Sequence, residues 1–333
     1  MIHLRIVAPE EVAHKALEVL RASPAVLNVV HLHGAATKPD GDLILCDVAR
    51  EEASVIIGDL KELEIPRVGS IAVEHIDTAL SDAADRAEEA APGLPSDAVV
   101  WEEVEQRASE NTELSVSFVA FMVLAMQIGA VGILLDQPIL IVGAMVVGPE
   151  FGPLAGLSVA LVERRPDFAR RSLAALGVGF PTGIVLACLA TLVFQWIGAS
   201  PDDYVPSDHE LTGFISDPDF FSFFVAFVAG TAGILSLTNA KSGALIGVLI
   251  SVTTIPAASN IGVAAAYGDW NEAGGAAAQL VINLTSIVLA GLLTLFIQRR
   301  YYVTRRRKHL QDPSRAAAGL PVGRSAHRGR DDS

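Results

Sequence analysis

The chain has 333 residues, of which 51% are hydrophobic, with a mean hydropathy of +0.44 and a formal net charge of −14. This composition excludes an ordinary soluble protein and indicates several membrane spans, each of about 20 apolar residues. The charge is uneven, since residues 1–113 hold 9 Lys and Arg against 23 Asp and Glu, and the remainder holds 15 of each. The acidic part argues against nucleic acid as a partner, because phosphate binding needs a basic patch.

Residues 1–80 have the pattern of a small α+β domain. Strands are predicted at Ile2–Ala8, Ala25–His33, Asp42–Val48 and Ser70–Thr78, and helices at Glu10–Ala22 and Glu51–Leu63. The order βαββαβ is the ferredoxin-like pattern, and its topology is similar to that of small-ligand regulatory domains of the ACT type. We therefore predict a ferredoxin-like, ACT-like cytoplasmic domain.

Two histidines of this domain raise the question of a metal. His31 and His33 lie two positions apart on a predicted strand and therefore share a face. Zinc sites use three or four protein ligands, and no third ligand lies nearby in the sequence. We interpret both as surface or sheet-packing residues, and we expect no metal and no cofactor.

Residues 81–113 are predicted to form a helical linker. Its first part is acidic and rich in alanine, and Pro92 and Pro95 interrupt it. The segment Asp97–Asn111 has the spacing of an amphipathic helix, with an apolar stripe that includes Trp101. This helix is expected to pack on the soluble domain or to lie at the membrane face.

Six spans are predicted within residues 114–298. They are Leu114–Leu135, Pro138–Val162, Ser172–Ile197, Phe220–Leu237, Ser242–Tyr267 and Gly275–Ile297. The second connection carries four arginines, the fourth carries one lysine, and the flank after the last span is strongly basic, whereas the third and fifth connections are acidic. Because Lys and Arg favour cytoplasmic loops, both termini are expected in the cytoplasm. Residues 299–333 lack periodicity and are expected to form a basic, disordered tail.

The membrane half contains an internal repeat at an offset of 103 residues. Pro153 corresponds to Pro256, Ile184–Ala187 to Ile287–Ala290, and Gln195 to Gln298. The two copies cover about 114–197 and 217–298, with three spans each. An odd number of spans means that the second copy enters the bilayer inverted. Inverted repeats are the architecture of many secondary transporters, with the substrate site near the midplane between interrupted spans.

Three segments of the membrane half resemble a known family. They are Gly143-Ala-Met with the Gly-Pro pairs up to Pro153, Ala244-Leu-Ile-Gly with Pro256, and Gly268-Asp-Trp270 before an apolar last span. Together they resemble the DUF389 family of prokaryotic membrane proteins of uncharacterised function, over residues 114–297. The resemblance implies a prokaryotic cell membrane, and it implies no activity. The position of Glu150 is usually apolar in the family's pattern, so this residue departs from it.

The candidate site residues lie where the second and fifth spans are interrupted. They are Pro149, Glu150, Pro153, Thr253, Thr254, Pro256, Ser259 and Asn260. An ionisable group at membrane depth usually faces a bundle interior or a water cavity, often on an ion path. Alternatively, Glu150 lies in a water-filled vestibule or binds backbone donors freed by the prolines. The hydroxyl groups have a structural alternative as well, which is bonding to their own helix carbonyls.

Two functions are therefore expected. The first is a secondary transporter or channel-like carrier for a small solute or ion, and the alternative is a membrane sensor or scaffold whose soluble domain binds a ligand or partner. Motifs of hydrolases, zinc proteases and nucleotide-binding loops are missing from the sequence, so no enzyme is expected. The expected partners are the lipid bilayer and the solute or ion, and a homo-oligomer is left open.

Overall fold

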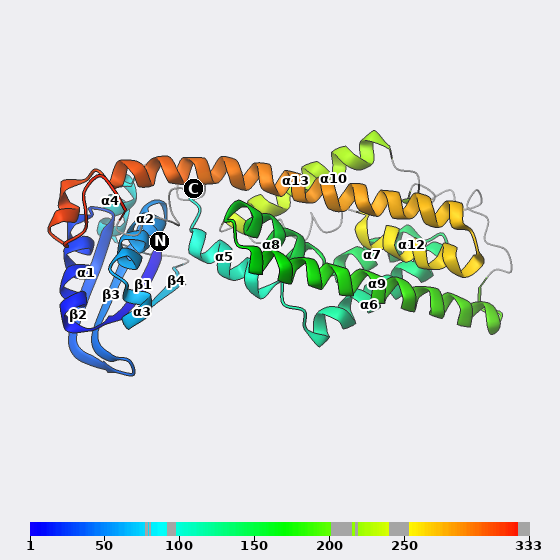
Figure 1. Cartoon of the computed structure of the whole chain (residues 1–333), viewed down its shortest axis with the longest axis horizontal. Coiled ribbons are helices and arrows are strands. Elements are labelled where there is room, and N and C mark those ends of the chain that lie inside the picture. The colour runs from blue at the N-terminus through cyan, green and yellow to red at the C-terminus, as the bar shows by residue number, and fades with distance from the viewer. Residues whose placement is uncertain are drawn as a thin grey trace. The chain divides into compact units, whose positions relative to one another are not determined.

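The computed structural model describes residues 1–76, 79, 81–91, 98–200, 215–216, 219–239 and 253–325. The chain divides into two compact units. Unit 1 consists of Met1–Val104 with Ile297–Ser333, and unit 2 consists of Glu105–Phe296. Figure 1 labels the helices and strands of both units along the chain.

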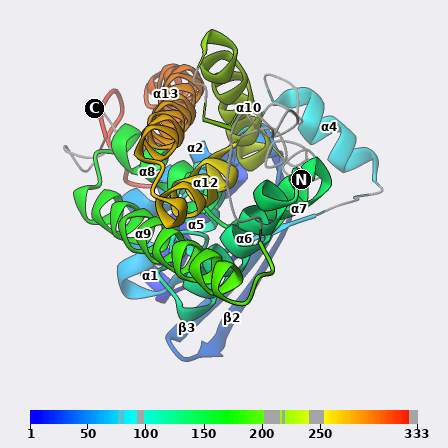
Figure 2. The ribbon, with the colours of Figure 1, turned by 90° about the vertical axis from the view of Figure 1, so that its right-hand side faces the viewer.

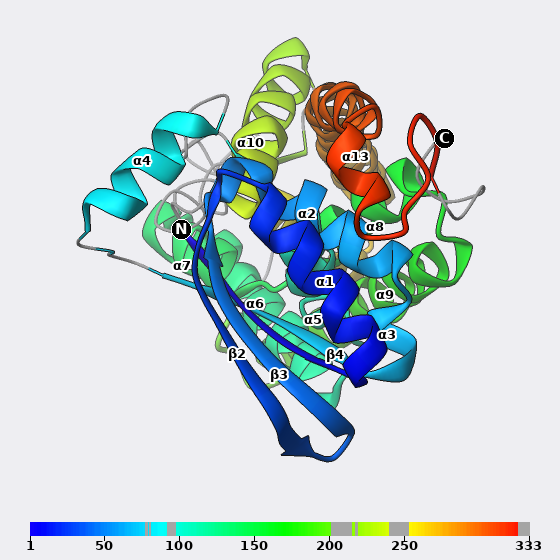
Figure 3. The ribbon, with the colours of Figure 1, turned by 90° about the vertical axis from the view of Figure 1, so that its left-hand side faces the viewer.

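Unit 1 is built on a four-stranded antiparallel sheet with the order β2-β3-β1-β4. The strands are β1 (Ile2–Ala8), β2 (Val26–Thr37), β3 (Asp40–Val48) and β4 (Ser70–His75), and the helices between them are α1 (Glu10–Ala22), α2 (Arg50–Glu62) and the short α3 (Ile65–Val68). Burial alternates along β1 and β3, as expected of strands with one face toward a core. Helices α1 and α2 cover that face (Figure 3).

The start of α5 is attached to α2 within unit 1. Helix α4 spans Asp82–Ala90, and α5 spans Trp101–Glu110. The backbone N–H of Trp101 donates to the Ser54 hydroxyl at 3.0 Å, and that hydroxyl donates to a carboxylate oxygen of Glu102 at 2.8 Å. Because Trp101 is also buried, the beginning of the predicted amphipathic helix packs on unit 1.

The predicted disordered tail is ordered up to residue 325. Helix α13 (Trp270–His309) continues through the basic flank, and a 3₁₀ helix, η4, follows at Pro313–Ala316. Further along, Leu320 packs against Val19. Composition predicted disorder because this segment offers little apolar surface, but its arginines form buried ion pairs with α2 of unit 1. Residues 326–333 of the predicted tail lie outside the described residues.

Unit 2 is helical and strongly apolar. Its helices are α6 (Val116–Leu134), α7 (Pro138–Val147), α8 (Phe151–Val162), α9 (Pro166–Trp196), α10 (Phe220–Thr238), α12 (Thr254–Tyr267) and the first part of α13. Among the described residues, α6, α9, α10 and α13 are each long and apolar enough to cross a membrane, and the bent pair α7–α8 makes a fifth candidate. The fifth predicted span, Ser242–Tyr267, is described only from 253 onward, as α12.

Helices α6, α9 and α12 lie side by side in unit 2 (Figure 2). Glycines permit this close packing: a Cβ on Gly129 of α6 would lie 2.4 Å from the Ser259 hydroxyl of α12. A Cβ on Gly262 of α12 would lie 2.7 Å from a carbonyl oxygen of α9. Small residues at helix contacts are typical of membrane bundles, where close backbone approach provides much of the attraction.

Candidate site at the helix break

The second predicted span is interrupted in its middle. Helix α7 ends at Val147, α8 begins at Phe151, and the two axes differ by 50°. Pro149 lies in the break itself. Pro153 and Pro256 lie in the first turns of α8 and α12, where a helix has no use for the missing N–H. These two prolines therefore begin helices, and Pro149 is the proline at the interruption.

A carboxylate and a hydroxyl group meet at this break. The Thr254 hydroxyl donates to Oε1 of Glu150 at 2.6 Å across 104 positions of sequence. Glu150 is 4% exposed and Thr254 is 1% exposed. Glu150 precedes the first residue of α8, and Thr254 is the first residue of α12. The carboxylate therefore lies at the N-termini of two helices, whose partial positive charge favours an anion.

The second carboxylate oxygen is available to a ligand. Oε2 of Glu150 is buried and has no hydrogen-bond partner among the residues that the structure describes. A Cβ on Gly148 would lie 2.4 Å from it, so the glycine leaves the space that this oxygen uses. A buried unpaired carboxylate oxygen is costly, which makes it a natural point for a proton or cation to bind.

Helix α13 adds two amides that the sequence did not place in the site. The Asn283 amide donates to the Thr253 hydroxyl at 3.0 Å, and Gln279 donates to the Asn283 carbonyl oxygen at 3.2 Å. Both amides are at most 2% exposed. Their spacing of four residues puts them on one helix face, and this was the only sequence signal for Gln279.

The remaining candidates fall outside the Glu150 group. Ser259 donates to the carbonyl of Ile255 at 2.8 Å, the structural alternative for such hydroxyls. Asn260 donates to Glu272 at 2.7 Å, at the start of α13. The structure thus joins Glu150 with Thr254 and Thr253 with Asn283. It also bonds Asn260 to Glu272, which the sequence predicts in the fifth connection.

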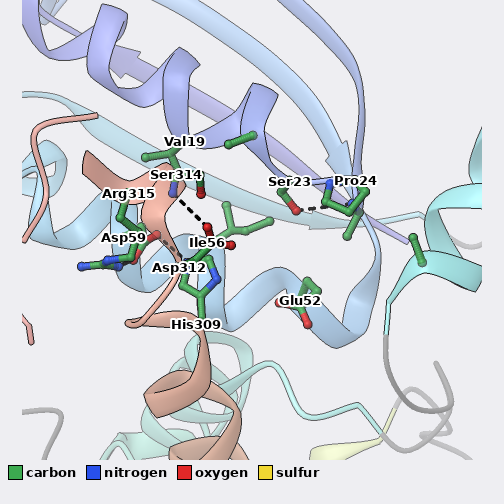
Figure 4. A pocket seen from close by; sticks show the side chains of 13 residues that line it. Val19, Ser23, Pro24, Glu52, Ile56, Asp59, His309, Asp312, Ser314 and Arg315 are labelled. Carbon is green, nitrogen blue, oxygen red and sulfur yellow. Dashed lines mark hydrogen bonds and ion pairs between the residues drawn. The ribbon is translucent and has the colours of Figure 1, made fainter. Parts of the chain in front are cut away.

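Unit 1 contains a separate cavity of about 180 Å³ (Figure 4). It is lined by Val19, Ala22, Ser23, Pro24, Ala25, Glu52, Ile56, Asp59, Ala90, His309, Asp312, Ser314 and Arg315. Burial acts to raise the pKa of Asp59, but a hydrogen bond from His309 and the charges of Arg306 and Arg315 outweigh it and hold that pKa below 3.8. One wall of the cavity therefore presents an ionised carboxylate that is already fully paired.

Comparisons with known proteins agree with the resemblance drawn from the sequence. Residues 145–289 match the model of the family described as "Domain of unknown function (DUF389)". "Uncharacterized protein MJ0678" of Methanocaldococcus jannaschii is 25% identical over 195 residues, which cover 59% of this chain and 58% of that relative. The chain thus matches little more than half of that relative's length. No solved structure matches the chain.

Proposed function

Given that the chain contains a DUF389 domain, we propose that it is a membrane carrier for a small solute or ion. The substrate would bind at the break between α7 and α8, where this helix pair meets the start of α12. One observation supports the proposal above all: the buried Glu150 is bonded to Thr254 at the N-termini of two helices. Helix ends that meet at an interrupted span are typical of the substrate sites of secondary transporters.

The donor set favours a proton or a small cation as the bound or coupled ion. Helices α6, α7, α8 and α12 contain no lysine or arginine. The groups near the break are a carboxylate, hydroxyls, amides and the last carbonyls of α7, which lack helical partners. Carboxylate and carbonyl oxygens suit hard cations, and Oε2 of Glu150 is the oxygen that would receive the ion.

The inverted-repeat architecture is part of the proposal and has support from the helix bounds. Corresponding helices of the two copies begin 103 or 104 positions apart, in the pairs α6 and α10, α8 and α12, and α9 and α13. The Ser115 side chain caps the N-terminus of α6, and the Asp219 side chain caps the N-terminus of α10 at the matching position. In the proposed architecture the chain has six spans, with both termini in the cytoplasm. The proposal also includes a ferredoxin-like domain, which the strand order β2-β3-β1-β4 supports.

The carrier function is tested in proteoliposomes that contain trapped pH and cation indicators, with radiolabelled solutes for the uncharged compounds. A panel of inorganic ions, amino acids, sugars and organic acids is imposed as gradients, with and without a membrane potential. At least one gradient should drive proton or cation movement by the wild type, and Glu150→Gln should reduce the rate at least tenfold. The matched control is Glu113→Gln, which changes an exposed acid outside the spans and should leave the rate unchanged.

The outcomes separate clearly. If the wild type moves no solute or ion in any condition, the carrier function is refuted. If a substrate moves equally well in wild type and Glu150→Gln, the protein is a carrier but the assigned site is wrong. Thr254→Val adds a finer test: it keeps the carboxylate and removes its hydroxyl donor, so it should mainly raise KM for the ion.

The unit 1 cavity favours a second candidate function, that of a membrane-anchored sensor or scaffold. Its lining combines the sheet domain with His309, Ser314 and Arg315 from the C-terminal segment. A small ligand there would contact both parts of unit 1. Thermal-shift screening of the full chain in detergent with metabolites and nucleotides tests this function. A ligand should stabilise the wild type and not Glu52→Gln, and stabilisation by no compound would refute the sensor.

A further inference from the structure

Three potential metal ligands converge at one end of the unit 1 sheet. They are His31 and His33 of β2 and Asp42 of β3, and their ligand atoms all lie within 4.8 Å of one another. Nε2 of His31 lies 2.8 Å from Oδ2 of Asp42, and Nδ1 of His33 lies 3.3 Å from the same oxygen. The ring centroids of the two histidines are 4.0 Å apart. Two imidazoles therefore point at a single carboxylate oxygen.

The fold creates this arrangement through an irregularity in β2. The pairing of β2 with β3 shifts its register between Leu32 and Ala36, as in a β-bulge. Gly34 within this stretch has φ +55°, a backbone conformation that favours glycine. Its N–H donates to Oδ1 of Asp42 at 2.9 Å. This hydrogen bond fixes one oxygen of the Asp42 carboxylate and leaves the other directed at the histidines. Carboxylates that bind metals are commonly held in place by such an additional hydrogen bond.

The spacing agrees with a tetrahedral metal site. Zinc binds histidine nitrogen and carboxylate oxygen at about 2.0–2.2 Å, and tetrahedral angles then separate the ligand atoms by about 3.4 Å. The observed separations of 2.8 and 3.3 Å are close to this value. Two imidazoles and one carboxylate are also donors that Zn²⁺, Ni²⁺ and Cu²⁺ accept more readily than Mg²⁺ or Ca²⁺.

The site is accessible from solvent, and a further imidazole lies nearby. The side chain of His33 is 67% exposed, whereas those of His31 and Asp42 are 14% and 5% exposed. A cation can therefore enter past His33 and meet a largely desolvated carboxylate. The exposed His14 of α1 has its ring centroid 6.2 Å from His31 and 6.3 Å from His33. A third imidazole therefore lies near the other two.

From this geometry we infer that His31, His33 and Asp42 bind a divalent transition-metal ion of the zinc type. The site lies within unit 1 and is independent of the proposed carrier site. The competing interpretation is a hydrogen-bonded cluster that only stabilises the sheet. A metal site and a stabilising cluster differ in their response to added metal, so the two interpretations can be separated by experiment.

The experiment uses the full chain in detergent, purified with a tag that contains no histidine and treated with a chelator. Titration calorimetry with Zn²⁺ should give one tight site per chain, and Co²⁺ should give the visible absorption of a four-coordinate nitrogen and oxygen site. His33→Gln should weaken Zn²⁺ binding at least tenfold, and Asp42→Asn should weaken it likewise. The matched control is His3→Gln, because His3 forms a pair with Asp47 at 2.7 Å and belongs to no group of three potential metal ligands among the described residues.

Thermal melting of each variant without metal reports whether it folds. His33 is exposed, so His33→Gln should melt with the wild type, which keeps the binding result interpretable. The inference is overturned if the wild type binds no Zn²⁺, or if His33→Gln and His3→Gln bind it equally. It is also overturned if Ca²⁺ or Mg²⁺ competes with Zn²⁺ at equal concentration, since an oxygen-type site would then be present.

Discussion

Replacing Arg306 by methionine should release the C-terminal segment from the rest of unit 1. The Arg306 guanidinium is buried and donates to Asp59 at 2.6 Å, to Glu62 at 2.7 Å and to the Val55 carbonyl at 2.8 Å. Arg315 forms ion pairs with the same two carboxylates. Two positive and two negative side chains therefore neutralise one another in the interior, and the methionine variant leaves two carboxylates with one arginine.

The size of the effect follows from this imbalance. Removing one partner of a buried ion pair costs about 3–5 kcal/mol, because the remaining charge stays buried without compensation. Methionine retains most of the aliphatic packing, so the charge accounts for the greater part of the loss. At roughly 2–4 °C per kcal/mol for a unit of this size, the melting temperature of unit 1 should fall by about 6–20 °C.

Hydrogen exchange measured by mass spectrometry, together with thermal melting, provides the assay. Peptides that cover 310–325 should lose protection in Arg306→Met, and unit 1 should melt earlier. Arg307→Met is the matched control, since Arg307 is the next residue and is exposed. Adding Glu62→Gln to Arg306→Met leaves Arg315 and Asp59 as a balanced ion pair. The double variant should therefore lose less stability than the sum of the losses in the two single variants.

Equal behaviour of the two arginine variants would refute this reasoning. If Arg306→Met and Arg307→Met have the same melting temperature and the same hydrogen-exchange protection in residues 310–325, the ion pairs do not hold the segment. Strict additivity in the double variant would show that Arg306 and Glu62 act independently, contrary to the geometry.

Three further predictions concern single groups. Acidification from pH 7 toward 5 should stabilise unit 1 slightly, because burial raises the pKa of Glu51 above 4.5 in the folded state. Stability should fall below about pH 4, because the pKa of Asp59 is depressed in the folded state and the unfolded chain binds that proton first. Denaturant melts that show no maximum of stability at acidic pH would contradict this prediction. Burial raises the pKa of Cys46 to about 12, so iodoacetamide at pH 8 should modify it only after unfolding, as mass spectrometry can show. Gly129→Ala should destabilise unit 2 by about 1–3 kcal/mol through overpacking, whereas Gly143→Ala, with open space around it, should not lower the melting temperature.

The sequence predicted unit 1 well where the signal was local. Alternating apolar residues and the turn residues near Pro39 placed the strands, and β1 spans Ile2–Ala8 as expected. The order at the C-terminus could not be predicted in the same way. The partners of Arg306 and Arg315 lie about 250 positions earlier in the chain, and a composition argument has no access to contacts at that distance.

The candidate site at the helix break could be predicted where it contains groups that are rare in apolar segments. A carboxylate within an apolar run marked Glu150, and the repeat offset pointed to the segment that begins at Thr253. Gln279 and Glu272 were missed because they belong to a helix without an interruption. Only packing brings Glu272 to Asn260 of α12, whereas Gln279 bonds to Asn283 within α13 itself.

The same limit explains why the sequence alone predicts no metal site at the histidine pair. A strand places His31 and His33 on one face by its period alone, but the third ligand comes from the neighbouring strand, whose register depends on the bulge around Gly34. A shift of that register by one residue would turn Asp42 to the opposite face of the sheet. Ligand counting along the sequence therefore underestimates sites in hairpins, because strand pairing brings together residues that spacing rules treat as unrelated.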